Sequence, residues 1–558
     1  MYYSKPKKAA LAAADRALNG LIGAIAGSLP DGARFCASWD APQRLRYTGR
    51  TQYRRGPGRG NAWLLGYASE SLVPQDVLTR PHYLGGYYMP EDGFCNLVEE
   101  VVDDMRVRCV AIGDNPDGDA VIFATVDCIG ISNDNVCLIR ERFEEKRRAA
   151  CPERAVCSAN VLSTHTHSCI DTQGLWTGGV KRILKAFGDV RKGRPHQKGV
   201  DDAYRAFLIE RVSDVMLAAL LDMRRGKLTY CVKDLGEGYF ENRNRPSATA
   251  LDTRVTRLVF TPDEKDVRPT LIALTNAHPD VAGMPTGDGS GTGRALSGDY
   301  VYYCGELIEQ AGYNFMFMNG AIAAIYMSRG LTNDGQPMEH RYEQSVRYGR
   351  ELARMLLAMD KTRRQIESDA LLSDRDNVER ERALAYRPEE YTLWYEGWEP
   401  VKTYTLRPFI NIRQRSVQVR VTNPIILLAG KLDLTDVTVV HTPDGFFVTT
   451  EVGYFELGER LRAAMVPGEF CQDLVQGGRS LRPEGSYSGL AFSYPTVRDI
   501  FGPDVIAVGL ANDEAGYIVP DNDYVLSDFK GHYQEELSLG HHTASTIMKA
   551  LQSLRPGS

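Results

Sequence analysis

The stretch NVLSTHTHSC, residues 160–169, joins the end of an apolar run to two histidines that stand two positions apart. The run from Val156 to Leu162 predicts a β-strand, and side chains at positions i and i+2 of a strand point to the same face. Two imidazoles on one face can bind one metal ion, or one can bind while the other transfers protons. His165 and His167 are therefore the first candidates for a functional site, and two strand-end polar residues without a metal are the alternative.

Strand-like apolar runs and helix-like periodic runs alternate along the rest of the chain. Strands are predicted at residues 105–112, 120–131, 228–235, 253–260, 270–278, 314–327, 447–457, 463–470 and 504–512, and helices at 136–150, 201–225, 300–312, 340–371 and 541–554. This alternation predicts an α/β protein with one main domain and surface insertions. We expect residues 1–90 to be a helix and a Gly/Pro-rich extension packed on a single large domain, residues 91–558.

The composition restricts the class of protein. A net charge of −6 and an isoelectric point near 6.0 argue against a general nucleic-acid binder. Eleven cysteines without a CxxC pair are typical of reduced, buried thiols in a cytoplasmic protein. No apolar run reaches the roughly 18 residues that span a bilayer, so no transmembrane segment is predicted. Asp15 and Arg16 interrupt the alanine-rich N-terminus, which argues against a signal peptide. The oligomeric state stays open, a homo-oligomer included.

Three further polar residues follow apolar runs. His278 ends LIALTNAH, Glu469 follows AAMVPG, and Tyr517 follows VIAVGLANDEAG. Two histidines and a carboxylate hold zinc while leaving a coordination position open for water or substrate, although the same donors also suit iron or manganese. Each residue taken alone has a structural alternative: a buried histidine, a glutamate that caps a helix, or a tyrosine of the core.

Four motifs, in this order, resemble those of the neutral/alkaline (non-lysosomal) ceramidase family. They are THTHSC at 164–169, NAHPD at 276–280, VPGEF at 466–470 and VGLANDEAGY at 508–517. The resemblance extends from about Tyr83 to the C-terminus. It implies a mixed-sheet α/β catalytic domain with helices packed around it. It also implies zinc-dependent hydrolysis of an amide bond in a ceramide-like, sphingolipid or other small N-acyl substrate.

The resemblance also implies roles for single residues. A Zn²⁺ ion would be held by His165, His278, Glu469 and Tyr517, and the catalytic residues would be His167, Tyr517, Arg245 and Tyr533. His167 would handle protons, and Arg245 in ENRNRPS would contact substrate, with Arg243 as the less favoured choice. Asp127 matches an acidic position beside the site. Simple surface polarity remains the alternative for Arg245 and Tyr533.

The chain also departs from the resembled family. The family's GDxSPN-like loop is replaced by MNGAIAAIYM, with Ala323 at the serine position and Ala321 at the aspartate position. The glycine-rich loop after the THTHSG motif becomes CIDTQGLW, residues 169–176. We expect no C-terminal immunoglobulin-like domain. Water activated by zinc is the nucleophile that remains. Two other functions stay open: a zinc hydrolase of a non-lipid ester or lactone, and a non-catalytic ceramidase-like binding protein.

Overall fold

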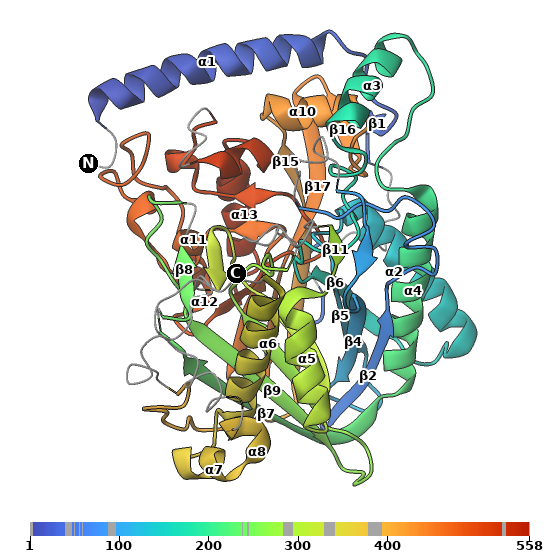
Figure 1. Ribbon diagram of the computed structural model, residues 1–558, viewed down its shortest axis with the longest axis vertical. Helices are drawn as coiled ribbons and strands as arrows, with labels where there is room; N and C mark the ends of the chain where they lie inside the picture. Colours follow the sequence, from blue (N-terminus) through green and yellow to red (C-terminus); the bar gives the residue numbers. More distant parts are fainter. Residues whose placement is uncertain are drawn as a thin grey trace.

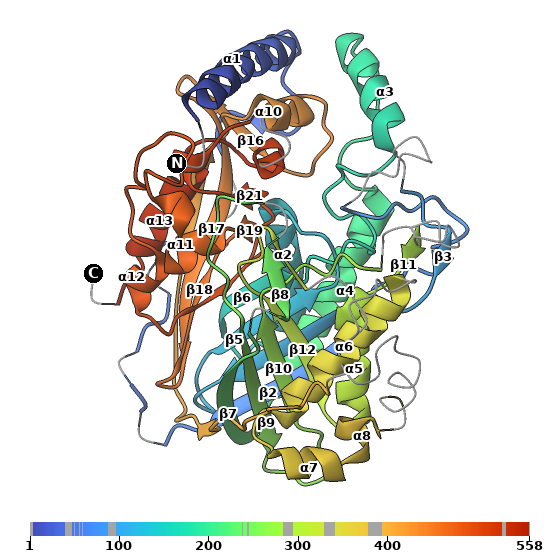
Figure 2. The same cartoon turned by 60° about the vertical axis from the view of Figure 1, so that its left-hand side comes forward.

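Two stacked β-sheets with helices on both outer sides form the molecule (Figures 1 and 2). The computed structural model describes residues 4–556, except 40–46, 50, 55, 59, 87–95, 237, 243–244, 283–293, 328–340, 376, 378–392 and 527–531. Arg243, the less favoured substrate contact, lies outside the described residues.

The larger sheet has nine strands and mixed direction. Its main path runs β12-β10-β9-β7-β2-β4-β5-β6, and β14 pairs with β7. The strands are β2 (Trp63–Ser71), β4 (Arg106–Gly113), β5 (Ala120–Val126), β6 (Val156–Ser163), β7 (Arg224–Asp234), β9 (Arg254–Pro262), β10 (Thr270–Thr275), β12 (Asn314–Asn319) and β14 (Tyr404–Thr405). β5 and β6 are parallel, as are β10 and β12, so each of these pairs ends at one edge of the sheet.

The smaller sheet has six strands, in the order β1-β16-β17-β18-β20, with β15 also paired to β17. The strands are β1 (Phe35–Cys36), β15 (Ile410–Arg420), β16 (Val439–Thr442), β17 (Gly445–Leu457), β18 (Leu461–Met465) and β20 (Ile506–Val508). Four short strands form two-stranded pairs: β3 (Glu100–Val101) with β11 (Ala295–Leu296), and β8 (Phe240–Asn242) with β13 (Ile325–Met327). The pair β19 (Glu469–Phe470) and β21 (Tyr517–Ile518) lies at the site described below.

Helices cover the outer faces of both sheets (Figure 2). On the larger sheet lie α2 (Asn133–Ala150), α4 (Asp202–Leu221), α5 (Asp299–Gln310) and α6 (Arg341–Ala358). The smaller sheet is covered by α11 (Gln472–Gln476), α12 (Val497–Phe501) and α13 (Thr543–Gln552). The peripheral helices are α1 (Lys5–Gly27), α3 (Gly179–Arg191), α7 (Arg363–Ser368), α8 (Ala370–Ser373) and α10 (Pro424–Lys431).

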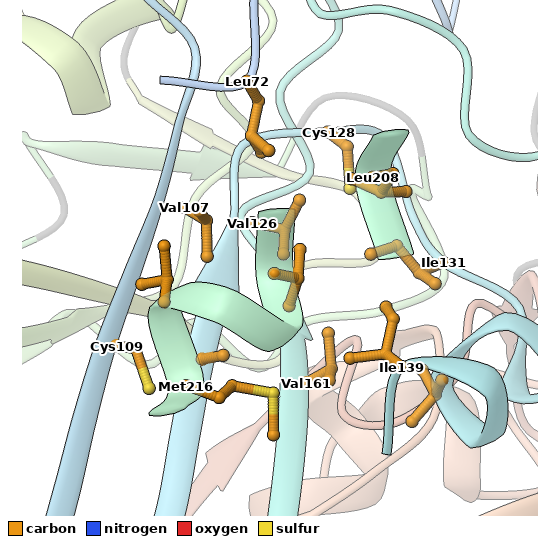
Figure 3. Close-up of a cluster of buried hydrophobic side chains, with 14 of the residues drawn as sticks. Leu72, Val107, Cys109, Val126, Cys128, Ile131, Ile139, Val161, Leu208 and Met216 are labelled. Carbon is orange, nitrogen blue, oxygen red and sulfur yellow. The ribbon is translucent and has the colours of Figure 1, made fainter. Parts of the chain in front are cut away.

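The strands β4, β5, β10 and β12 of the larger sheet are buried on both faces along nearly their whole length and are therefore mostly apolar on both. In β4, Val107 and Cys109 pack against α2 and α4, whereas Val110 and Ile112 pack against the smaller sheet. Figure 3 shows the first of these layers, where Val107, Cys109 and Met216 lie together. Continuous burial explains why these strands are readable as unbroken apolar runs. The α/β class predicted from the sequence is confirmed.

The N-terminal ninety residues differ from the expected extension in one respect. Trp63–Ser71 forms β2, which lies between β7 and β4 in the interior of the larger sheet, so residue 90 does not separate an extension from the main fold. By length and composition alone, helix α1 could cross a membrane, and the absence of a transmembrane segment stays a prediction. Only Ala26 of this helix is buried, and the helix packs on α10. Surface helices and signal sequences share these properties, so α1 does not show where in the cell the protein is found.

A buried ion pair joins helix α2 to the smaller sheet. Both oxygens of Glu451 in β17 accept hydrogen bonds from Arg140, at 2.7 and 2.9 Å. Removing one partner of such a pair leaves an uncompensated buried charge. We expect Glu451→Ala to lower the free energy of unfolding by about 3–5 kcal/mol in urea titration. Glu145→Ala breaks an exposed pair with Arg142 and should cost about 1 kcal/mol or less. Equal effects of the two substitutions would contradict this assignment.

Candidate metal and catalytic site

The candidate residues meet where strands of both sheets end. His165 follows the end of β6 by two residues, and His278 follows the end of β10 by three. Glu469 begins β19, just beyond β18, and Tyr517 begins β21. The two short strands are parallel, with Glu469 and Tyr517 as partners in register. Four segments far apart in the sequence therefore bring their polar residues to one place.

Three imidazoles converge at this point. The ring centroid of His165 lies 4.8 Å from that of His167 and 4.7 Å from that of His278. One nitrogen of each ring lies within 4.8 Å of the others, so the three residues can share one metal ion. His165 and His278 are almost fully buried. Both ring nitrogens of His167 are buried too, although the residue as a whole keeps partial exposure.

Backbone carbonyl groups orient two of these rings. Nδ1 of His165 lies 2.7 Å from the carbonyl oxygen of Ile129, and Nδ1 of His278 lies 2.9 Å from that of Ile325. A protonated Nδ1 donates each bond, so Nε2 is the nitrogen that carries a lone pair for a metal. Both Nε2 atoms approach the same oxygen, Oε2 of Glu469, at 3.4 and 2.8 Å. Two imidazoles and a carboxylate with oriented outer nitrogens fit the donor set of zinc.

Burial and mutual charge set the protonation of the group. Burial opposes ionisation of Glu469, but His165 and His278 outweigh it and hold the pKa of this carboxyl far below its ordinary value. For His278, burial lowers the pKa and Glu469 raises it, with a net increase. Burial, reinforced by the two neighbouring histidines, lowers the pKa of His167 well below its ordinary value. His167 is therefore neutral near pH 7.

The histidines do not meet in the way that the strand pattern predicted. β6 ends at Ser163, and His165 has φ of 67°, a left-handed conformation that is uncommon for a residue with a side chain. Such strain persists where surrounding contacts enforce it, often at functional sites. The main chain here is held on both sides, since Thr166 donates to the Cys128 carbonyl and His167 to that of Pro279. A turn, rather than strand alternation, brings the two rings together.

Tyrosine hydroxyl groups lie beside Glu469. The hydroxyl oxygens of Tyr517 and Tyr533 are 3.0 Å apart, so the structure brings these two sequence candidates together. Burial, and then the charge of Glu469, raise the pKa of Tyr517 well above its ordinary value, which keeps the phenol protonated. Tyr326, which the sequence analysis missed, stacks on His278 with ring centroids 4.4 Å apart. No motif marks Tyr326, because only the fold places its short strand beside the histidine.

Arg245 has surroundings that differ from the substrate contact implied by the resemblance. Its side chain is fully buried, and its guanidinium donates to Asp523 at 3.0 Å and to Glu535 at 3.1 Å. It also donates to Gln534, the residue after Tyr533. These bonds fix the short 3-10 helix Tyr533–Leu537. The geometry therefore gives Arg245 the task of positioning the segment that carries Tyr533.

The other acidic candidate, Asp127, is also part of a buried ion pair. Its carboxylate lies 2.8 Å from the guanidinium of Arg108 and accepts the backbone N–H of Arg106. Both side chains of the pair are buried within the larger sheet. The ion pair with Arg108 accounts for the negative charge of Asp127, so no contact with substrate is needed to explain it.

The segment MNGAIAAIYM, residues 318–327, borders the site and is called the alanine loop below. Ala323 forms a bridge with Cys471, two residues after Glu469, and its N–H donates to the Phe470 carbonyl. Ile325 of the same loop accepts hydrogen bonds from both the backbone and the ring of His278. Ala324 adopts φ of 69°, a second left-handed residue at the site. The loop thus supports the histidine through its backbone, and Ala321 and Ala323 bring no hydroxyl or carboxylate.

Comparison with known proteins places the fold. The structure is similar to that of the neutral ceramidase from Pseudomonas aeruginosa, with a TM-score of 0.56 and 13% identity, covering 88% of this chain and 74% of that one. A structure described as ceramidase complexed with C2 has a TM-score of 0.54 and 12% identity, covering 88% and 75%. At this identity the likeness shows a ceramidase-like fold. No family model and no curated protein matches the sequence.

Gly86 tests how tightly His167 is held. A methyl group on Gly86 would lie 2.5 Å from Nδ1 of His167, and the glycine has φ of 101°. Gly86→Ala should therefore combine backbone strain with displacement of the ring, at about 2–5 kcal/mol of unfolding free energy. Gly312→Ala is the matched control, since Gly312 has φ of 88° and open space around it. Urea titration should show the larger loss for Gly86→Ala; equal losses would mean that the ring is not constrained there.

Glu535 gives the protein a specific acid sensitivity. Burial opposes its ionisation, but Arg245 and His532 outweigh burial and lower its pKa. Because the folded pKa lies below the ordinary value of about 4.3, this stabilisation is complete above that pH and is lost as the pH falls further. We expect the melting temperature of the wild type to fall more steeply between pH 5 and 3 than that of Glu535→Gln. Parallel curves would contradict the prediction.

Proposed function

We propose that this protein is a zinc-dependent hydrolase that cleaves the amide bond of a ceramide-like or other N-acyl substrate. The observation that carries the proposal is the approach of two buried imidazole nitrogens to one oxygen of Glu469, with both outer ring nitrogens bonded to backbone carbonyls. The ceramidase-like fold and the order of the four motifs support the substrate class.

Two overlapping donor sets are available for the metal. The three histidines form one, and His165, His278 and Glu469 with Tyr517 form the other. We assign the second set, because the Nε2 atoms of the two buried histidines are directed at Glu469 rather than at His167. In this assignment His167 is not a metal ligand, and its task is proton transfer. A bound zinc ion lowers the pKa of a water molecule to about 7 and polarises a carbonyl group.

The residues of this chain have separable tasks in that reaction. His167, neutral near pH 7, accepts the proton of the attacking water and returns it to the leaving amine. The phenol of Tyr533 donates a hydrogen bond toward negative charge that develops on the carbonyl oxygen, while Tyr517, whose hydroxyl oxygen lies 3.0 Å from that of Tyr533, would be a metal ligand. Arg245 holds Tyr533 through the 3-10 helix. No serine is needed, which agrees with Ala323 at the position of the resembled family's serine.

Metal content measured by elemental analysis tests the proposal. We expect about one zinc per chain in the wild type, lost in His165→Ala, His278→Ala and Glu469→Ala. The exposed residue His441 provides a control, and His441→Ala should keep the metal. A wild type that contains no metal and takes up no added zinc would overturn the proposal.

His167→Ala separates ligation from proton transfer. With His167 as the proton carrier, this variant should keep zinc and lose about 100- to 10,000-fold in kcat on N-acyl amides. Loss of zinc would instead assign His167 to the metal and support the three-histidine donor set. Zinc without turnover in the wild type, across N-acyl amides, esters and lactones, would support a binding protein. Turnover of esters or lactones alone would support the alternative function, a zinc hydrolase of a non-lipid ester or lactone.

A further inference from the structure

A basic stretch near the N-terminus takes no part in the candidate metal site. It is RLRYTGRTQYRRGPGR, residues 44–59, with six arginines and no aspartate or glutamate. Its described residues run along the edge of β15 that does not pair with β17. Gly49 donates its N–H to the Gln414 carbonyl, and Ile412 of β15 donates to the carbonyl of Gln52. Backbone hydrogen bonds therefore fix this stretch against the smaller sheet.

A cavity of about 400 Å³ lies between this stretch, β15 and the end of helix α13. Cavities that bind small molecules typically measure about 300–1,000 Å³, so a molecule well above the size of water fits. Arg413 is partly buried and Arg415 is exposed, so the cavity opens to solvent. The side chains that line it include Thr48, Thr51 and Tyr53 from the stretch, Arg413 and Arg415 from β15, and Ser553 just after α13.

Both arginines of the cavity come from one face of β15, because residues two positions apart on a strand point to the same side. A hydrogen bond of 3.1 Å from Arg415 to the Ser553 hydroxyl holds one guanidinium. The guanidinium of Arg413 donates to the Arg555 carbonyl at 3.3 Å, and its Cζ lies 4.4 Å from the centre of the Tyr53 ring. Each guanidinium has five N–H donors, and the described residues take only one from each.

The positive charge of these two groups has no carboxylate partner among the residues that the structure describes. The neighbouring carboxylates are bonded elsewhere. Asp114 pairs with Arg54 at 3.3 Å, and Glu456 accepts hydrogen bonds from Asn411 and Tyr454. Two adjacent cations in one cavity repel each other, and an anion bound between them turns that repulsion into attraction.

We propose that this cavity binds a phosphate group, carried by a soluble phosphate or phosphate ester or by a phospholipid headgroup. The planar fork of a guanidinium donates two parallel N–H bonds to phosphate oxygens, and a tetrahedral phosphate offers oxygens to both forks at once. The hydroxyl groups of Thr48 and Thr51 line the same cavity and can donate to the remaining oxygens. Among the described residues no carboxylate lines the cavity, which disfavours a cationic ligand. The site shares no residue with the candidate metal site and does not depend on the proposed hydrolase function.

Calorimetric titration with inorganic phosphate, at constant low ionic strength, tests the site. We expect one phosphate per chain in the wild type. Arg413→Gln and Arg415→Gln each remove charge-assisted hydrogen bonds and should raise the Kd about tenfold or more. Because Arg415 is exposed, its substitution tests the site even if Arg413→Gln lowers stability. Arg415→Lys keeps the charge without the fork and should give an intermediate Kd.

Arg420→Gln is the matched control, because it removes the same charge from β15 at a position outside the cavity. It should leave the Kd for phosphate nearly unchanged. An equal loss in this variant would mean general attraction of anions to a basic surface and would overturn the site. Undiminished phosphate binding in both Arg413→Gln and Arg415→Gln would overturn it too, and loss of that binding in His165→Ala would then place the anion at the metal site.

Two further probes distinguish the source of the phosphate group. They are phenyl phosphate and vesicles of phosphatidylcholine that contain phosphatidic acid. Binding of phenyl phosphate that weakens in the cavity variants assigns the site to a soluble ester. Binding of the vesicles alone, with the same dependence on the two arginines, assigns it to a lipid headgroup. No binding of inorganic phosphate, phenyl phosphate or vesicles by the wild type would overturn the proposal.

Discussion

The site depends on the hydrogen bonds that the two buried imidazoles donate to the backbone carbonyl groups of Ile129 and Ile325. Each carbonyl takes the outer nitrogen of a ring and thereby turns the other nitrogen toward Glu469. The carbonyls themselves are placed by the larger sheet, since Ile129 follows β5, and by the alanine loop that follows β12. Stacked, buried sheets resist small displacements, so the geometry of the donors is set before any ligand binds.

The alanine loop supports the site through its backbone and brings no reactive side chain. Ala321 and Ala323 cannot act as an acid or a nucleophile. The same loop still bridges to Cys471, supports His278 through Ile325 and carries Tyr326 against the imidazole ring. In the proposed hydrolase, the absence of a hydroxyl in this loop favours water, rather than a side chain, as the attacking group.

Charged groups inside the fold organise the site at a distance. Arg245, fully buried between Asp523 and Glu535, ties the segment that carries Tyr533 to the rest of the smaller sheet's helical layer. Arg140 does the same for α2 and β17. Buried pairs of this kind add little net stability but are costly to break. They make the position of Tyr533 depend on residues that do not face the histidines.

The sequence by itself determined the α/β class, most of the strands and the candidates His165, His167, His278, Glu469 and Tyr517, because buried strands leave unbroken apolar runs and the motifs stand at their ends. It failed at β2, whose polar residues hid a central strand, and it failed on how His165 and His167 meet, because a left-handed turn leaves no periodic pattern. Only the tertiary structure decided that Arg245 is enclosed by carboxylates and that Tyr326 stacks on His278. These contacts join segments that are tens to hundreds of residues apart, and no local pattern of residue types encodes such distances.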